Sequence, residues 1–127
     1  MRLGVRNYPK DEWNNMSGED AAKVQPMPTG NGIDVAVEVA KDLRAMGLDH
    51  IAEDIEARIR LGEKKYGTRL KSHNGRDAML DLYQEILDGC NYAKQLVIED
   101  KVGGQTLYIQ LLALAGNVKE LLDNPVV

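Results

Sequence analysis

The chain has 127 residues, enough for one domain, and 43% of them are apolar and 28% charged. These fractions exclude a disordered chain, and no run of about 18 apolar residues is present that would span a membrane. The net charge of −4 is too small to indicate a partner. One cysteine, Cys90, and two histidines exclude an internal disulfide and a cysteine- or histidine-rich metal site, so any metal must take oxygen ligands. The chain does not begin with a secretory signal, so we expect a cytoplasmic protein.

The prolines indicate two regions. All four lie near the ends, at 9, 26, 28 and 125, so residues 29–124 contain nothing that forbids a helix. Residues 1–32 are rich in turn-forming residues and are predicted to form an N-terminal arm, ordered by packing of Trp13 on a neighbour. Residues 33–127 are predicted to form one all-α domain of four helices.

The first two helices are defined by apolar spacing and by glycines that end them. One helix is predicted over 34–46, with Gly47 as its stop, and a second over 49–66, with Asp49 as its cap and Gly67 as its end. The predicted core stripes are Val35, Val39, Leu43 and Met46 in the first helix, and Ile51, Ile55 and Ile59 in the second.

A loop over 67–75 precedes the third predicted helix, which begins near Asp77 and runs to about Glu99. The Gly103-Gly104 pair then separates it from a fourth helix. Because short helices cannot bury their apolar stripes alone, we expect the four to pack on one another and on a second copy of the chain. The stripe of the fourth helix consists of Leu107, Leu111, Ala115, Val118 and Leu122.

The charge changes sign between Arg76 and Asp77. Residues 58–76 contain seven basic residues and one acid, whereas residues 77–92 contain four acids and no base. These four acids fall within about 80° of the third helix's circumference and form one acidic stripe. Like charges at this spacing destabilise a helix, so a compensating interaction is expected. The stripe consists of Asp77, Asp81, Glu85 and Asp88.

Two interpretations of the acidic stripe are open. The simpler one is a solvated helix face, helped by the positive N-terminal end of the helix. The other is a metal site, because Glu85 borders the apolar arc of its helix, and Glu56 and Glu63 border the isoleucine stripe of the second helix. Two such helices packed antiparallel would bring carboxylates together as ligands for Mg²⁺ or Mn²⁺, with basic residues nearby for phosphates.

A family resemblance supports the second interpretation. Glu53-x-x-Glu56, followed after 28 residues by Glu85-x-x-Asp88, resembles the metal-binding pattern of the all-α nucleoside triphosphate pyrophosphohydrolases, the MazG-type enzymes and dimeric dUTPases. The similarity to small MazG-like proteins of phages and prophages covers about residues 35–100. It is carried by Arg58-x-Arg60-x-Gly62-x-x-x-Tyr66-Gly67, by Asn74-Gly75-Arg76-Asp77-Ala78 and by Asp81-Leu82-Tyr83-Gln84-Glu85-x-x-Asp88-x-x-Asn91-Tyr92.

The resemblance implies a four-helix MazG-like bundle, assembled as a homodimer or homotetramer, with Mg²⁺ (or Mn²⁺) between two helices. The implied reaction is attack of a metal-activated water on the α-phosphorus of a (d)NTP, which releases pyrophosphate and a monophosphate. Glu56 or Glu63 would take the proton of that water. The implied metal ligands are Glu53, Glu56, Glu85 and Asp88. The expected substrate-binding residues are Arg60, Lys64, Lys65, Arg69, Arg76, Asn91 and Tyr92.

The chain departs from the family pattern on the second helix. Arg60 stands where another acid often falls, and Glu63 is its possible replacement. The ligand pair on this helix is therefore either Glu53 with Glu56 or Glu56 with Glu63. Arg60 suits an ion pair with Glu56 or Glu63 as well as it suits substrate contact.

Two alternatives to the enzyme remain. A MazG-like bundle that has lost a ligand would be catalytically silent and would act as an interaction or regulatory protein. The basic residues of 58–76 also suit a nucleic-acid binder, but the acids that follow at once would repel a phosphate backbone. No zinc or RNA-binding signature accompanies the cations, so nucleic-acid binding is disfavoured.

Overall fold

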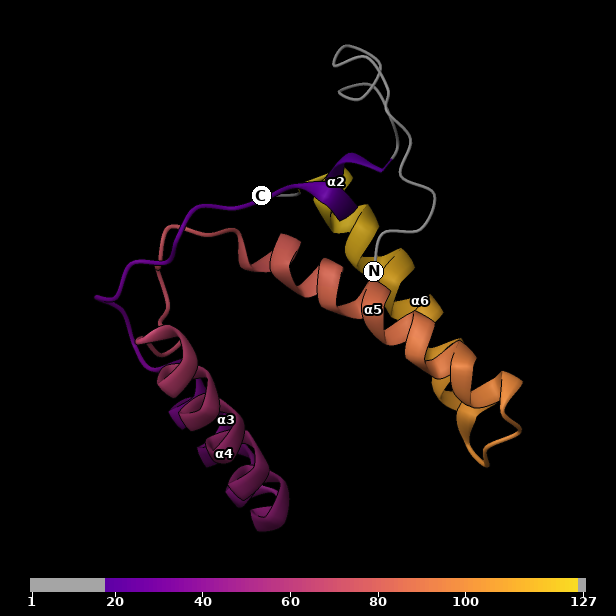
Figure 1. Ribbon diagram of the computed structural model, residues 1–127, viewed down its shortest axis with the longest axis horizontal. Coiled ribbons are helices and arrows are strands. Elements are labelled where there is room, and N and C mark those ends of the chain that lie inside the picture. Colours follow the sequence, from indigo (N-terminus) through magenta and orange to yellow (C-terminus); the bar gives the residue numbers. More distant parts are fainter. Residues whose placement is uncertain (1–17, 126–127) are drawn as a thin grey trace. The chain divides into compact units, whose positions relative to one another are not determined.

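The computed structural model describes residues 18–125, and within this range all regular structure is helical, which confirms the expected all-α class. The one extended feature in the described range is a single antiparallel bridge between Asp34 and Lys71. No helix in this range combines the length and apolar character needed to cross a membrane. The helices are α2 (Glu19–Ala22), α3 (Val35–Ala45), α4 (Asp49–Tyr66), α5 (Ala78–Ile98) and α6 (Gly104–Asp123) (Figure 1).

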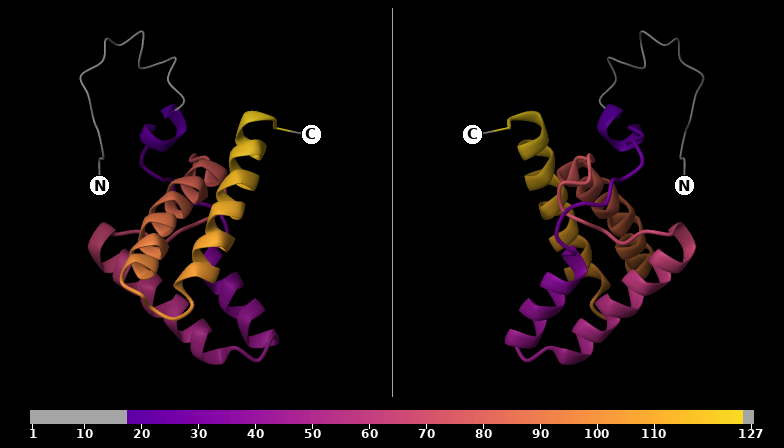
Figure 2. Two further views of the ribbon diagram at one scale, coloured as in Figure 1. Left: turned by 90° about the vertical axis from the view of Figure 1, so that its right-hand side faces the viewer. Right: turned by 90° about the vertical axis from the view of Figure 1, so that its left-hand side faces the viewer.

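The described residues belong to two compact units. One unit contains the described residues up to Val24 and those from Asp77 on, and the other contains Gln25–Arg76. In all views α3 runs beside α4, and α5 runs beside α6 (Figures 1 and 2). Each unit is therefore built on one antiparallel helical hairpin. The predicted packing of Trp13 lies outside the described residues.

The ends of α3 and α4 follow local chemistry. The Asp34 carboxylate accepts a hydrogen bond from the Val37 backbone N at 3.3 Å and caps α3. Gly67 ends α4 with a φ of 77°, a left-handed conformation that costs glycine little. The predicted capping by Asp49 is wrong, because Leu48 occupies the cap position and its carbonyl accepts the first bonds of α4. Asp49 instead lies in the first turn, where its charge still favours the helix dipole.

Alanines, rather than the predicted larger residues, form the seam between α3 and α4. Ala36 and Ala40 of α3 and Ala52 of α4 are the buried apolar residues of this unit. The predicted stripe of α3 is therefore rotated by one residue, and Val39 and Met46 are exposed. Small side chains let two helix backbones approach closely, and this gain outweighs burial of the valines.

Backbone hydrogen bonds hold the segment before α3 against the loop after α4. Ser72 N donates to Ile33 O at 2.8 Å, and Thr29 N donates to Asn74 O at 2.9 Å. Gly32 is required at this contact, because a Cβ there would lie 1.7 Å from the Ser72 carbonyl oxygen. The loop predicted over 67–75 is thus a fixed part of its unit.

The hairpin of α5 and α6 has the larger core (Figure 2). Asp77 caps α5 by accepting hydrogen bonds from the backbone N atoms of its first turn, at 3.0 and 3.3 Å. The start of α6 approaches α5 closely, since a Cβ on Gly104 would lie 2.9 Å from Leu96 Cβ. The buried apolar side chains of this unit are Leu80, Ile86, Ala93 and Val118.

The short helix α2 lies within the region predicted as an arm and packs on α5. Gln84 Nε2 donates to the backbone carbonyls of Asp20 and Lys23, at 2.9 and 3.0 Å. Lys119 Nζ of α6 lies 2.7 Å from the Asp20 carboxylate, and this pair raises the pKa of Lys119. A single turn of helix has no strong sequence signal, so these tertiary contacts decide its position.

We expect Gly104→Ala to lower the free energy of unfolding by about 1–3 kcal/mol, because the added Cβ overlaps Leu96. Gly116→Ala is the matched control in the same helix. A Cβ at Gly116 meets nothing within 4 Å, so this change should raise stability by up to about 1 kcal/mol. Urea denaturation of both variants measures the difference, and equal effects would contradict the close approach of α5 and α6.

Candidate functional site

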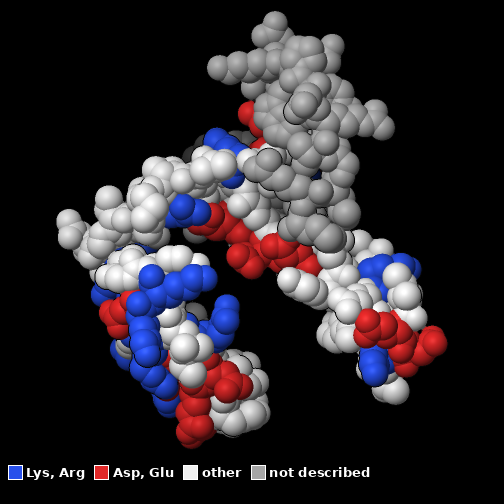
Figure 3. Space-filling model, in the orientation of Figure 1, with Lys and Arg blue, Asp and Glu red and all other residues white. Residues whose placement is uncertain are grey.

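The acidic stripe of α5 contains two carboxylates that stand apart from the rest. Asp77 is engaged as the helix cap, which supplies part of the compensation that the stripe requires. Glu85 and Asp88 are exposed, one turn apart, and neither has a hydrogen-bond or ion-pair partner among residues 18–125. Acidic atoms form a row along α5 in Figure 3. Glu85 and Asp88 are therefore the carboxylates best placed to receive a cation.

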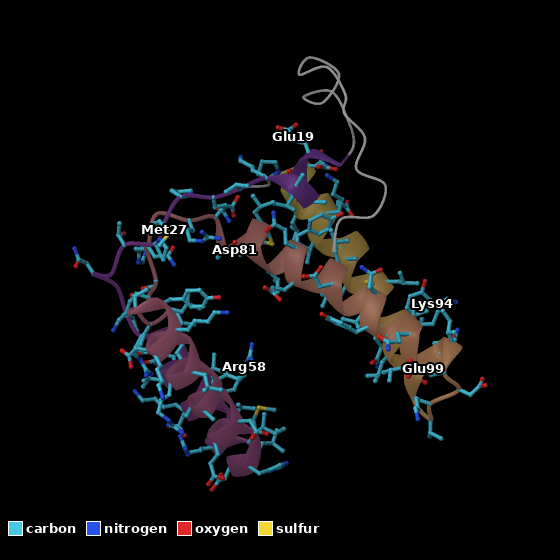
Figure 4. All side chains as sticks on the ribbon, in the orientation of Figure 1. Glu19, Met27, Arg58, Asp81, Lys94 and Glu99 are labelled. Carbon is cyan, nitrogen blue, oxygen red and sulfur yellow. The ribbon has the colours of Figure 1, made fainter. Side chains whose placement is uncertain are left out.

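An open pocket adjoins Asp88 on α5. Three residues expected at the site, Asp88, Asn91 and Tyr92, line it together. Figure 4 shows Lys94 and Glu99 near the end of α5 and Asp81 near its start. The pocket thus combines a carboxylate, amides and one aromatic ring, a set that suits the polar edges and flat face of a nucleoside. Its lining is completed by Lys94, Gln95, Ile98 and Glu99.

On α4, the predicted ligand Glu56 is already paired. Arg44 Nη2 of α3 donates to Glu56 Oε1 at 2.5 Å, and Arg44 Nη1 lies 3.5 Å from Oε2. The hydrogen bond from Arg44 lowers the pKa of Glu56, and Arg60 and Arg69 add weaker attraction. Arg44, and not Arg60, is therefore the ion-pair partner of Glu56.

A second ion network surrounds Arg69. Its Nε donates to Asp34 Oδ2 at 2.6 Å, and its Nη1 lies 3.8 Å from Glu63 Oε1. The side chains of Asp34 and Arg69 are mostly buried, at 19% and 23% exposure. Hydrogen bonding to Arg69 is the main cause that lowers the pKa of Asp34. Arg69 thus joins the start of α3 to the loop after α4, a structural role that the sequence prediction of substrate binding did not include.

The remaining basic site residues differ in how far they are engaged. Arg76 donates to the backbone carbonyl of Pro26 at 2.8 Å, so part of its guanidinium is committed to the fold. Arg60, Lys64 and Lys65 are exposed on α4, and the Lys65 ammonium lies 5.1 Å from the centre of the Tyr66 ring. Basic atoms gather over the unit of α3 and α4 in Figure 3. The three α4 cations are consequently the ones available to a phosphate.

The four predicted metal ligands come from both units. Glu53 and Glu56 lie on α4, and Glu85 and Asp88 lie on α5, so the structure gives each pair on its own helix. Within residues 18–125 no three acidic, histidine or cysteine side chains are grouped as a metal centre. The α5 pair fits a hard cation, because both carboxylates are exposed and unengaged. The α4 pair fits less well, because a cation would compete with Arg44 for Glu56.

Two of these ionic residues were missed in the sequence. Arg44 gave no signal in the acid pattern, although a two-residue turn after α3 requires the end of α3 to lie beside the start of α4. Asp34 was recognisable only as a helix start, since its partner Arg69 is 35 residues away. Long-range ion pairs of this kind leave no periodic trace in a sequence.

Comparison of this chain with protein-family models, curated proteins and solved structures found no match. The function is therefore argued from the residues of the chain and the local geometry of each unit.

We expect Asp34→Asn to lower the free energy of unfolding by about 1 kcal/mol at pH 7, because Asn still caps α3 but loses the ion pair with Arg69. The pKa of Asp34 is lowered in the folded protein, so its contribution is present above about pH 4 and is lost as pH falls below that. The wild type and variant should therefore converge in stability near about pH 2. Urea denaturation at several pH values measures this, with Asp42→Asn on the exposed side of α3 as control. A difference that persists unchanged at low pH would contradict the ion pair.

Proposed function

We propose that this protein is a Mg²⁺-dependent nucleoside triphosphate pyrophosphohydrolase that converts a (d)NTP and water to a (d)NMP and pyrophosphate. The observation that carries the proposal is the pair of exposed, unpartnered carboxylates Glu85 and Asp88, next to a pocket lined by Asn91 and Tyr92. A carboxylate pair one turn apart on a rigid helix is suited to a hard cation. The neighbouring amide and aromatic ring suit the nucleoside of the same ligand.

The metal would be held by Glu85 and Asp88 together with Glu53 and Glu56. When bound, Mg²⁺ supplies Lewis-acid activation of the phosphate oxygens and lowers the pKa of water. The chain contributes position, because Asp77 fixes the first turn of α5 and Ile86 anchors that helix in the hairpin core. Glu56 becomes available for this role only when its bond to Arg44 is exchanged for one to the cation.

The exposed cations of α4 would bind the triphosphate. Lys64 and Lys65 lie in the last turn of α4 and are flexible enough to follow phosphate oxygens. Arg60 is exposed one turn earlier on the same helix. Arg69 and Arg76 are held by Asp34 and by the Pro26 carbonyl, so we assign them to supporting this region rather than to direct contact with phosphate.

The proton of the attacking water would go to a carboxylate of α4. Glu56 is the weaker candidate, because Arg44 lowers its pKa and occupies its oxygens. Glu63 is half exposed, and its contact with Arg69 is longer, at 3.8 Å. We therefore assign the general base to Glu63.

A second candidate is a catalytically silent MazG-like bundle that acts as an interaction or regulatory protein. The observation that favours it is the Arg44–Glu56 ion pair, which occupies a predicted ligand in both of its oxygens. In this case the charges on α4 serve the fold, and the acids of α5 are a solvated helix face. The two candidates differ in whether the protein binds Mg²⁺.

We expect the purified protein to release pyrophosphate from at least one triphosphate in a panel of ribo- and deoxynucleotides with Mg²⁺ or Mn²⁺. Glu85→Gln should lower kcat/KM by at least about 100-fold, because it removes a charged ligand while keeping the side chain's shape. Glu120→Gln, at an exposed glutamate of α6, is the matched control and should leave turnover unchanged. A well-folded wild type that releases no pyrophosphate from any nucleotide would refute the enzyme proposal.

We expect millimolar Mg²⁺ to raise the Tm of the wild type and to have a smaller effect on Glu85→Gln. Arg44→Gln should bind Mg²⁺ more tightly than the wild type, because Glu56 no longer has a competing cation. Calorimetric titration with Mg²⁺ measures both affinities. A wild type without a Mg²⁺ response, and an Arg44→Gln variant that is destabilised and equally unresponsive, would favour the silent bundle.

A further inference from the structure

The helix α6 is unusual because most of it carries no charge. Residues 104–118 contain no Asp, Glu, Lys or Arg, and charged side chains begin only at Lys119. A helix at the surface of a soluble unit normally shows a charged face opposite its buried face. Only one side of α6 is covered, by α5, so the uncharged remainder of its surface lacks the pattern of a solvated face.

The uncovered side of α6 contains a ridge of three leucines, Leu107, Leu114 and Leu121, spaced seven residues apart. They fall within about 40° of one another around the helix. Each is about half exposed, at 48%, 43% and 50%. We call these three side chains the leucine ridge.

The leucine ridge continues the seam between α5 and α6. Leu111 and Val118 alternate with the ridge residues at spacings of three and four, and Val118 is buried. Leu111 lies against Gly89 of α5, where an added Cβ would be 3.6 Å from its Cδ2. The combined spacing is the heptad pattern of helices that pack nearly parallel to their neighbours. Half of this pattern is satisfied by α5, and the other half needs another long helix.

The charges of the chain indicate which helix this is. The helix α4 is long enough, but it has nine charged residues in eighteen, and residues 104–118 offer them no counter-charge. The helix α3 has only 11 residues, about 16 Å, and is shorter than the ridge of about 21 Å. A second copy of α6 has the required length, brings no charge into the contact and presents leucines to leucines.

We propose that the leucine ridge is a homodimer interface, in which α6 of two copies pair antiparallel about a two-fold axis at Leu114. The ridge is symmetric about this residue, so Leu107 meets Leu121 of the second copy at both ends. The antiparallel order opposes the helix dipoles and keeps Glu120 and Asp123 of the two copies apart. Together with the two copies of α5, the pair completes a four-helix bundle.

The available area is sufficient for a stable dimer. A helix of 20 residues is about 30 Å long and about 10 Å wide, so α6 and the adjoining side of α5 present about 600 Å² per copy. Two copies would bury about 1,200 Å², which lies within the range of specific interfaces. The dimer requires neither metal nor nucleotide, so its test is independent of the proposed function.

The first test uses two leucines of equal exposure on opposite sides of α6. Leu114 and Leu112 are 43% and 42% exposed, and they lie about 160° apart around the helix. We expect the wild type to sediment as a dimer of twice 14.1 kDa. Leu114→Glu should raise the dissociation constant by at least about 100-fold, because it buries two carboxylates at the axis. Leu112→Glu should leave the dimer intact. A monomeric wild type at about 100 μM, or equal dissociation by both variants, would overturn the proposal.

The second test fixes the geometry and does not depend on a disruptive variant. In a Cys90→Ser background, Leu114→Cys should form an intermolecular disulfide under mild oxidation, because residue 114 meets its own copy. Leu107→Cys should not cross-link to itself, since its two copies would lie about 21 Å from the axis on opposite sides. A mixture of Leu107→Cys and Leu121→Cys chains should cross-link. Self-linking of Leu107→Cys as strongly as Leu114→Cys would refute the antiparallel pairing. Circular dichroism establishes that each variant retains its helices.

Discussion

Small side chains at the two helix–helix seams are the constraint on which the rest of the structure depends. Ala36, Ala40 and Ala52 bring α3 against α4, and Gly104 brings the start of α6 against α5. Close backbones leave little space between helices, so the larger apolar side chains point elsewhere. The exposed valines of α3 and the leucine ridge of α6 are therefore consequences of the same choice of residues at the seams. A chain with so few large buried side chains has apolar surface left for a further contact.

Acidic residues are treated differently in the two hairpins. In the hairpin of α3 and α4 they are neutralised, as Arg44 holds Glu56 and Arg69 holds Asp34. On α5, Glu85 has no such partner among the described residues, and the helix tolerates it partly because Asp77 serves as the cap. The cost of desolvating a paired acid and the freedom of an unpaired one set their chemical roles. Glu56 stabilises its hairpin, and Glu85 remains available for a ligand.

The charged and uncharged helices also divide the proposed roles of the chain. The long helix α4 carries the cations that would meet a triphosphate, and α5 carries carboxylates and a nucleoside-like pocket. The charge-free part of α6 has no group that binds phosphate or metal, but its leucines suit a helix of the same kind. In this scheme α5 links the two roles, because one side of it packs on α6 and another side carries Glu85 and Asp88.

The sequence by itself determined the all-α class and the four long helices to within one or two residues, because helical spacing, Asp34 and Asp77 as caps, and glycines after the helices are local signals. It also located the acids of α5 correctly on one exposed side. Only the tertiary structure decided that alanines form the first seam, that Arg44 pairs with Glu56, and that α2 docks on α5. These outcomes depend on which helix faces approach most closely and on ion pairs between distant residues, and neither is encoded in local periodicity.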